Sequence, residues 1–436
     1  MEGWMVPAVI LVSFLILLGT GMPIAFALTG LSAILLWVFM GPTALFMVVA
    51  SAFKQIGAEV FIAIPLFVVM AAVLQNSGIS ESLYRTMHIW MGPLKGGLCI
   101  GTLWICAIID ALSGIGATAT TTMGVIALPE MVKRGYDKKM VLGAITVGGA
   151  LGPLIPPSVL MIIVGGYAQL SVGKLFIGGV LPGILITACW AVYVGIRCHL
   201  RPELGPPMPI EERGTMREKI LGLRHVVMPL GLASFIMAGI YTGIFTPTEA
   251  GGFGAMGALV ISLVHRKFSW SGLMSSLQLG LRVTAMILWL VIGGGCFSTL
   301  VTVTGTGKLI LDMLSGLALG TTGVIMVMLL IALILGCFID PVAITMICVP
   351  IFIPVLNALG VDIFTFMMLF IIAVVIGYIT PPFGLNLFYM KGVAPSGTSI
   401  LDIYRAVTPY TIIMIGCLFI CLWFPAIVTW LPSFMK

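Results

Sequence analysis

Apolar stretches of about 20 residues recur along the whole chain, and no other feature constrains the fold as strongly. A helix of about 20 apolar residues is long enough to cross the hydrocarbon core of a bilayer. Charged residues make up only 8% of the chain, whereas soluble domains contain about 25%. We therefore predict an all-α polytopic membrane protein with these crossing segments: 5–20, 22–40, 58–76, 139–170, 178–197, 226–245, 247–264, 283–303, 363–390 and 408–427.

Two further apolar regions, 96–130 and 320–356, are interrupted near their middle by small or polar residues. The interruptions read DALSGIGATAT at 110–120 and IDPVAIT at 339–345. Irregular backbone at membrane depth is tolerated only where protein buries it or where it lines a cavity. We predict that each region enters the membrane and returns on the same side, as a re-entrant hairpin.

Lysine and arginine gather in one set of loops. Of the 21 Lys and Arg residues, 17 lie in five loops: 77–95, 131–139, 197–225, 265–282 and 391–407. Cytoplasmic loops of membrane proteins carry an excess of positive charge, so we place these loops in the cytoplasm and both termini outside. The net charge of +6 then reflects membrane topology, and we expect no nucleic-acid partner.

The two halves of the chain share the spacing of their helix-breaking residues. A shift of 225 positions brings these pairs together: Thr120 and Thr345, Pro129 and Pro354, Gly135 and Gly360, Asp137 and Asp362, Gly152 and Gly377, Pro156 and Pro381, Pro157 and Pro382. Each half has five crossings and one hairpin, and because five is odd the halves have opposite orientation. Inverted repeats with interrupted helices are typical of secondary transporters.

This pattern predicts the domain organisation. The first inverted-topology repeat is 1–196, with hairpin 96–130 and broken helix 139–170. Residues 197–225 form a cytoplasmic linker. The second repeat is 226–436, with hairpin 320–356 and broken helix 363–390.

Doubled prolines interrupt one apolar segment in each half. The stretches ALGPLIPPSV at 150–159 and VIGYITPPFG at 375–384 leave backbone carbonyls without helical partners. Oxygen ligands suit a hard cation such as Na⁺, and the N-terminus of the second half-helix suits an anionic substrate. The alternative is that the prolines only kink the helices for packing. The candidate cation ligands are Gly152, Leu154 and Pro157 in the first break, and Gly377, Ile379, Pro382 and the Thr380 hydroxyl in the second.

Small residues occupy the first hairpin tip. Ser113, Gly114 and Gly116 let backbone approach a ligand closely. The hydroxyls of Thr118 and Thr120 either bind a ligand or satisfy helix carbonyls.

Three polar side chains in membrane segments have two interpretations each, and the role of a fourth stays open. Asp340 before Pro341 is an ordinary helix start, but an acid inside a membrane segment also indicates a functional site, and we favour a cap that lines the site. Glu249 closes a TPTE capping box, which favours a structural role over proton coupling. Asn386 contacts either substrate or a neighbouring helix. Asp110 has no acidic counterpart at position 335, which leaves its role open.

Catalytic signatures such as HExxH, GxSxG and GxxxxGK[ST] are absent from the sequence, so we expect neither enzyme activity nor an organic cofactor. Three amphipathic stretches, 42–55, 79–91 and 270–281, are typical of interfacial helices. They also suit arms that connect a moving core to a fixed frame in the membrane lipid.

Four stretches together resemble the large membrane subunit (DctM-type, M subunit) of tripartite ATP-independent periplasmic (TRAP) transporters: DALSGIGATAT at 110–120, GGALGPLIPPS at 148–158, GIFTPTEA at 243–250 and GYITPPFGLN at 377–386. The resemblance covers essentially the full length. It implies the ion transporter superfamily, elevator motion and sodium-driven import of an organic acid across the bacterial cytoplasmic (inner) membrane. It also implies two separate partners, a small four-helix membrane subunit and a periplasmic substrate-binding protein.

The resemblance further implies one sodium ion at each tip and break, with substrate between the tips. The expected sodium ligands are Ser113, Gly114, Gly152, Leu154 and Pro157 at the first site, and Gly336, Asp340, Gly377, Ile379, Thr380 and Pro382 at the second. The expected substrate contacts are Gly116, Ala117, Thr118, Ser158, Pro341 and Asn386. A stand-alone sodium- or proton-coupled carboxylate carrier of the same superfamily is the alternative. C4-dicarboxylates, 2-oxo acids, sugar acids and sialic acid all stay open as substrates.

Overall fold

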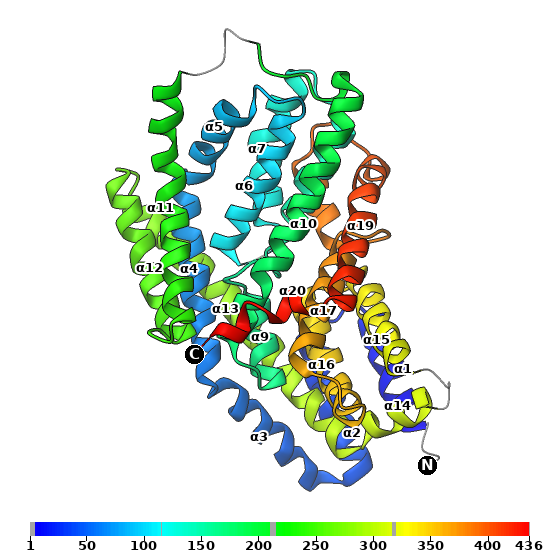
Figure 1. The fold of residues 1–436 in the computed structure, drawn as a ribbon. Helices are drawn as coiled ribbons and strands as arrows, with labels where there is room; N and C mark the ends of the chain where they lie inside the picture. The colour runs from blue at the N-terminus through cyan, green and yellow to red at the C-terminus, as the bar shows by residue number, and fades with distance from the viewer. Residues whose placement is uncertain (1–4, 115, 210–214, 316–319, 436) are drawn as a thin grey trace.

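The computed structural model describes residues 5–114, 116–209, 215–315 and 320–435 as a bundle of α-helices (Figure 1). No strand occurs in these ranges. Within them, seven helical segments are long and apolar enough to cross a membrane, and shorter apolar helices accompany them. The prediction of an all-α polytopic membrane protein is confirmed.

The first half of the chain contains twelve helical elements, two of them short 3₁₀ turns. They are α1 (Met5–Gly19), α2 (Ile24–Met40), η1 (Pro42–Ala44), α3 (Leu45–Ile56), η2 (Glu59–Ile62), α4 (Ala63–Asn76), α5 (Ile79–Met91), α6 (Gly97–Ser113), α7 (Thr118–Lys133), α8 (Lys138–Gly148), α9 (Val159–Ala168) and α10 (Val172–Leu200).

A short turn, η3 (Pro202–Leu204), lies in the linker that joins the halves. The second half then contains α11 (Met216–Tyr241), α12 (Pro247–Val264), α13 (Trp270–Val303), α14 (Thr306–Ser315), α15 (Thr321–Gly336), α16 (Pro341–Ala358), α17 (Ile363–Tyr378), α18 (Leu385–Val393), α19 (Ile400–Trp423), α20 (Ala426–Thr429) and η5 (Pro432–Phe434).

Helix α13 differs from its prediction. The sequence predicts an amphipathic stretch at 270–281 and a separate crossing at 283–303, but the structure joins them in one helix of 34 residues. No proline lies between the two stretches. Gly280 stays helical, and its open side lies against Val69. A further helix, α14, lies where the hydropathy pattern predicts none.

Capping side chains fix where several helices begin. Helix α11 starts at Met216, ahead of the apolar run, because Thr215 and Glu218 form a capping box. The predicted box of Thr246 and Glu249 is also present: the Thr246 N–H donates to the Glu249 carboxylate at 2.8 Å, and the Glu249 N–H donates to the Thr246 hydroxyl at 3.2 Å. The structural interpretation of Glu249 is confirmed.

The helices of the second half follow those of the first at nearly constant spacing. Adding 225 to the bounds of α6, α7, α8 and α9 gives 322–338, 343–358, 363–373 and 384–393, close to those of α15, α16, α17 and α18. The packing repeats too, since α6 contacts α8 as α15 contacts α17, and α2 contacts α13 as α12 contacts α4. Between the halves, α7 packs on α18 and α16 packs on α9.

The first segments of the two broken helices occupy the core. Every residue of α17 from Phe366 to Tyr378 is buried, and so is every residue of α8 from Met140 to Gly148. Figure 1 shows α17 near the middle of the molecule, with α11 and α12 at one edge and α3 at another. Helix α3 has no buried residue, which agrees with its predicted role as an amphipathic arm.

Candidate functional site

The first broken helix stops at the end of α8 and resumes in α9, and the chain between them is almost entirely buried. The tip of the α6–α7 hairpin holds this break by two backbone hydrogen bonds. The Ala117 N–H donates to the Gly149 carbonyl at 3.0 Å, and the Val159 N–H donates to the Gly114 carbonyl at 3.1 Å. The predicted re-entrant tip and the first break therefore form one structural unit.

Two of the predicted carbonyl ligands in this break face different neighbours. The Pro157 carbonyl points at the hairpin tip, since a Cβ on Gly114 would collide with its oxygen. The Leu154 carbonyl instead faces α10, where a Cβ on Gly179 would collide with it. The structure thus brings Gly114 and Pro157 together and places Leu154 on the far side of the break.

Two serines of the predicted site are buried in this unit. The Ser158 hydroxyl donates to the Pro153 carbonyl at 2.8 Å and accepts from the Met161 N–H at 3.4 Å, so it caps α9. The Ser113 hydroxyl lies 3.5 Å from the carbonyl oxygen of Asp110, one turn earlier in α6. The predicted substrate contact of Ser158 and the predicted sodium contact of Ser113 stay predictions.

Asp110 is the acidic side chain at the first tip, and it is fully buried. Its carboxyl group faces the backbone N–H groups of Ala119, Leu151 and Gly152, although none reaches strict hydrogen-bond geometry. Among the described residues no side chain bonds to either of its oxygens. A buried carboxylate without a charged partner is costly, so this position favours a bound proton or cation.

The second broken helix repeats this arrangement. Helix α17 ends at Tyr378, and Gly336 at the end of α15 lies against Gly377, where an added Cβ would come within 2.8 Å of the Gly377 Cα. The Gly384 N–H donates to the Cys337 carbonyl at 2.8 Å. The structure therefore brings Gly336 and Gly377 together, as the sodium-site prediction requires. Both doubled prolines, one in each break, contain a cis peptide bond.

Asp340 begins the second arm of the second hairpin. Its carboxylate accepts from the Val342 N–H at 2.9 Å, which confirms the predicted helix cap at Asp340 and Pro341. The Pro341 carbonyl accepts from the Thr345 hydroxyl at 2.9 Å. The further role of Asp340 as a cation ligand and of Pro341 as a substrate contact stays a prediction.

The remaining predicted ligands lie along the second break. The Thr380 hydroxyl donates to the Ile376 carbonyl at 2.6 Å, which leaves its lone pairs available. Ile379 is fully buried. The Pro382 carbonyl accepts a hydrogen bond from the Tyr404 hydroxyl of α19, so that carbonyl already has one partner.

Each hairpin tip and the helix break that it contacts form a tip-and-break unit, and the two units meet through Tyr378. A Cβ on Gly116 would lie 3.0 Å from the Tyr378 ring, so the first tip touches the second break. Sequence reasoning missed Tyr378, and its position directly before the second break in GYITPP was the available signal.

Asn386 joins the halves from α18. Its side-chain NH₂ donates to the Thr120 hydroxyl at 2.9 Å and to the Thr146 carbonyl at 2.5 Å. Its carbonyl oxygen is buried with no partner among the described residues. The interpretation of Asn386 as a bond to neighbouring helices is confirmed, and its contact with substrate stays a prediction. Thr118 lies elsewhere, where the tip borders α4.

A family model decides where this arrangement belongs. The model described as "Tripartite ATP-independent periplasmic transporter, DctM component" matches residues 11–427. The chain belongs to this family. The predicted resemblance to the large TRAP membrane subunit is thereby confirmed.

Relatives in the DctM family agree with the match. The C4-dicarboxylate TRAP transporter large permease protein DctM of Pseudomonas aeruginosa is 31% identical over 409 residues, which cover 93% of this chain and 94% of that protein. The isethionate TRAP transporter permease protein DctMQ of Oleidesulfovibrio alaskensis is 30% identical over 415 residues, 95% of this chain and 64% of that protein. The chain thus spans less than two thirds of the second relative. Both relatives are permeases, in agreement with the expectation that the chain is not an enzyme.

A solved transporter structure has a similar fold. The YdaH transporter of Alcanivorax borkumensis matches with a TM-score of 0.64 at 14% identity, over 89% of this chain and 90% of that one. This DctM-family chain therefore has the fold of a membrane transporter.

Proposed function

We propose that the chain imports a small organic acid in symport with Na⁺ across the bacterial inner membrane. In this proposal a periplasmic binding protein delivers the substrate, and a separate small four-helix membrane subunit accompanies the chain. Family membership supports the transport function. The relatives named for C4-dicarboxylate and isethionate support an organic anion as substrate. The longer relative is named DctMQ, and this chain matches only 64% of it. We take the remaining part, Q, as the counterpart of the small subunit.

The meeting of the two tip-and-break units carries the proposal. The first unit holds non-helical backbone that is buried between helices, whereas Pro382 and Phe383 of the second break are exposed. The units touch where Gly116 lies on Tyr378. Buried irregular backbone in a membrane protein is typical of an ion or substrate site. We assign one Na⁺ to each unit and the substrate to the region between the tips, with the ligands that the sequence predicts and with Asp110 added at the first unit.

We also infer inverted repeats and an elevator motion. The matched helix bounds and the reciprocal contacts of α7 with α18 and of α16 with α9 support the repeat. The amphipathic helices α3 and α5 suit arms that let the tip-and-break units slide against a frame.

Uptake by proteoliposomes tests the function. The chain and its small subunit are reconstituted, and labelled organic acids are added with or without an inward Na⁺ gradient and the cognate binding protein. We expect uptake only when both are present. Uptake that follows pH and ignores Na⁺ would contradict sodium coupling. Sodium-driven uptake without the binding protein would instead establish the stand-alone carrier.

A further inference from the structure

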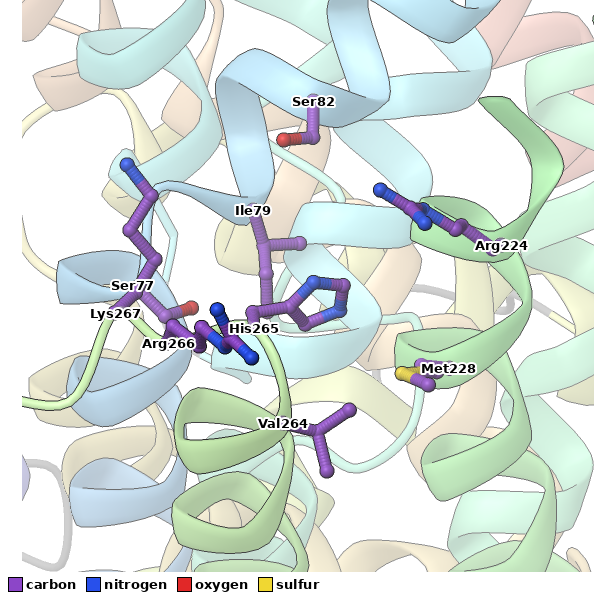
Figure 2. A pocket seen from close by; sticks show the side chains of 9 residues that line it. All are labelled: Ser77, Ile79, Ser82, Arg224, Met228, Val264, His265, Arg266 and Lys267. Carbon is purple, nitrogen blue, oxygen red and sulfur yellow. The ribbon is translucent and has the colours of Figure 1, made fainter. Parts of the chain in front are cut away.

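A basic cavity lies among the α4–α5 connection, α11 and the turn that joins α12 to α13, and none of its lining residues belongs to the tip-and-break units. Its volume is about 440 Å³. Figure 2 shows its lining side chains, which come from three separate stretches of the chain. They are Ser77, Ile79, Ser82, Arg224, Met228, Val264, His265, Arg266 and Lys267.

The lining carries a surplus of positive charge. Arg224, Arg266 and Lys267 contribute three cations, and none of the nine lining residues that the structure describes is acidic. This lining is therefore suited to an oxyanion.

The backbone fixes two of these cations. After α12 the chain turns through Arg266, whose φ of 54° is left-handed, and the Lys267 N–H returns to the Ser262 carbonyl at 3.0 Å. This turn keeps two successive basic residues at the cavity edge, and Arg224 approaches from α11 (Figure 2). Cations at a helix C-terminus also interact favourably with its dipole, but that effect does not account for Arg224, which lies near the start of α11.

Apolar surface continues from the cavity along two helices. Val264 on α12 is 57% exposed and Met228 on α11 is 36% exposed. Val227, next to Met228, and Val260, one turn before Val264, are also exposed. A ligand with a phosphate group and hydrocarbon chains would match both the basic cavity and this apolar surface.

We propose that this cavity binds the head group of an anionic phospholipid, with the acyl chains along α11 and α12. The basic loops of the chain place the cavity at the cytoplasmic leaflet, where anionic lipids attract basic residues. The bound lipid joins the α4–α5 connection to α11 and α12. This inference needs only that the chain lies in a membrane, and it does not depend on the transport proposal.

Lipid binding to the purified chain tests the proposal. Delipidated protein in an uncharged detergent is titrated with phosphatidylglycerol, and in parallel with phosphatidylcholine that has the same acyl chains. Native mass spectrometry and the melting temperature report binding. We expect phosphatidylglycerol to bind about tenfold more tightly and to raise the melting temperature more.

Charge-matched variants locate the site. The double variant Arg224→Gln with Lys267→Gln should abolish the preference for phosphatidylglycerol. If that variant does not fold, Arg266→Gln with Lys267→Gln replaces it, with the same expected result. Lys95→Gln with Arg201→Gln removes the same charge from exposed positions outside the cavity lining and should keep the preference.

Three results would overturn the proposal. The first is equal binding of the two lipids by the unmodified chain, which needs no variant. The second is an equal loss in the cavity and control variants, which would indicate diffuse attraction. The third is stabilisation by inorganic phosphate alone to the same extent as by phosphatidylglycerol, which would assign the cavity to a free oxyanion.

Discussion

At the level of single residues, Asp110 and Asn386 place polar atoms deep inside an apolar protein. Both have buried oxygens without a hydrogen-bond partner among the described residues. Buried polar atoms normally find partners, so exceptions point to a function or to an absent ligand. Asp110 adjoins the first break, whereas Asn386 bonds Thr120 and Thr146 across the two halves.

Replacing Asp110 tests its role at the first sodium site. If its carboxylate helps to hold Na⁺, Asp110→Asn should raise the Na⁺ concentration for half-maximal transport by at least about tenfold, since an interaction with a charged group contributes about 1.5–3 kcal/mol. Na⁺ should also raise the melting temperature of the variant less than that of the unmodified chain, because weaker binding stabilises less at the same Na⁺ concentration. Transport and melting temperature are measured across a Na⁺ titration.

Asp312→Asn is the matched control, because Asp312 is exposed on α14. Its Na⁺ titration should equal that of the unmodified chain. An unchanged Na⁺ titration in a folded Asp110→Asn protein would exclude the carboxylate from the site.

Single residues were predictable from sequence only where a local rule determines them. The cap at Asp340 and the capping box at Thr246 follow from residue spacing. The bonds of Asn386 to Thr120 and Thr146 depend on helices more than 200 residues apart, and no local pattern indicates them.

At the level of elements, each helical hairpin (α6–α7 and α15–α16) is attached to one broken helix through backbone. The second attachment depends on Gly336 and Gly377, whose backbones are too close for a side chain. The first attachment consists of two hydrogen bonds, from the Ala117 N–H to the Gly149 carbonyl and from the Val159 N–H to the Gly114 carbonyl. Because these contacts involve main chain, each hairpin tip has little freedom to move away from its own break.

Adding one methyl group tests this attachment. Gly336→Ala places a Cβ 2.8 Å from the Gly377 Cα and 3.1 Å from the Val374 carbonyl. We expect a loss of about 1–3 kcal/mol of stability from overpacking, together with a loss of transport. The melting temperature and Na⁺-dependent uptake report the two effects.

Gly416→Ala in α19 is the control, since a Cβ there has no neighbour within 4 Å. It should leave stability unchanged or raise it slightly, because alanine favours a helix over glycine. Equal effects of the two substitutions would show that the close approach at Gly336 is unimportant.

Hydropathy predicted most elements because membrane helices need long apolar runs. Hydropathy failed at α13, where an amphipathic stretch and an apolar stretch form one continuous helix. The chain changes from amphipathic to apolar there, but no helix-breaking residue separates the two stretches. Hydropathy also failed at α14, which is too short and polar to be recognised as a crossing segment. Only the 225-residue spacing shows that α14 occupies the position in the second half that α5 occupies in the first.

At the level of the whole molecule, the halves are interlocked. Helix α9 of the first half packs on α16, and α18 of the second half packs on α7. The Trp190 indole N–H also donates to the Tyr410 carbonyl at 2.9 Å between α10 and α19. Neither half buries its own broken helix without the other.

Splitting the chain tests this interdependence. Residues 1–209 and 215–436 are produced separately or together, with the break in the polar linker. We expect each fragment alone to aggregate in detergent, because burial of its broken helix needs the other half. Co-produced fragments should elute as one monodisperse complex in size-exclusion chromatography. A single fragment that is monodisperse and helical alone would contradict the prediction.

The exchange of helices between the halves also limits how such a chain evolves. Because α7 meets α18 and α9 meets α16, a change of side-chain size in one half must be accommodated by a residue about half a chain away. The halves therefore cannot drift independently, even if they descend from one duplicated ancestor. A chimera that takes one half from a relative 31% identical to this chain would inherit mismatched surfaces at both contacts.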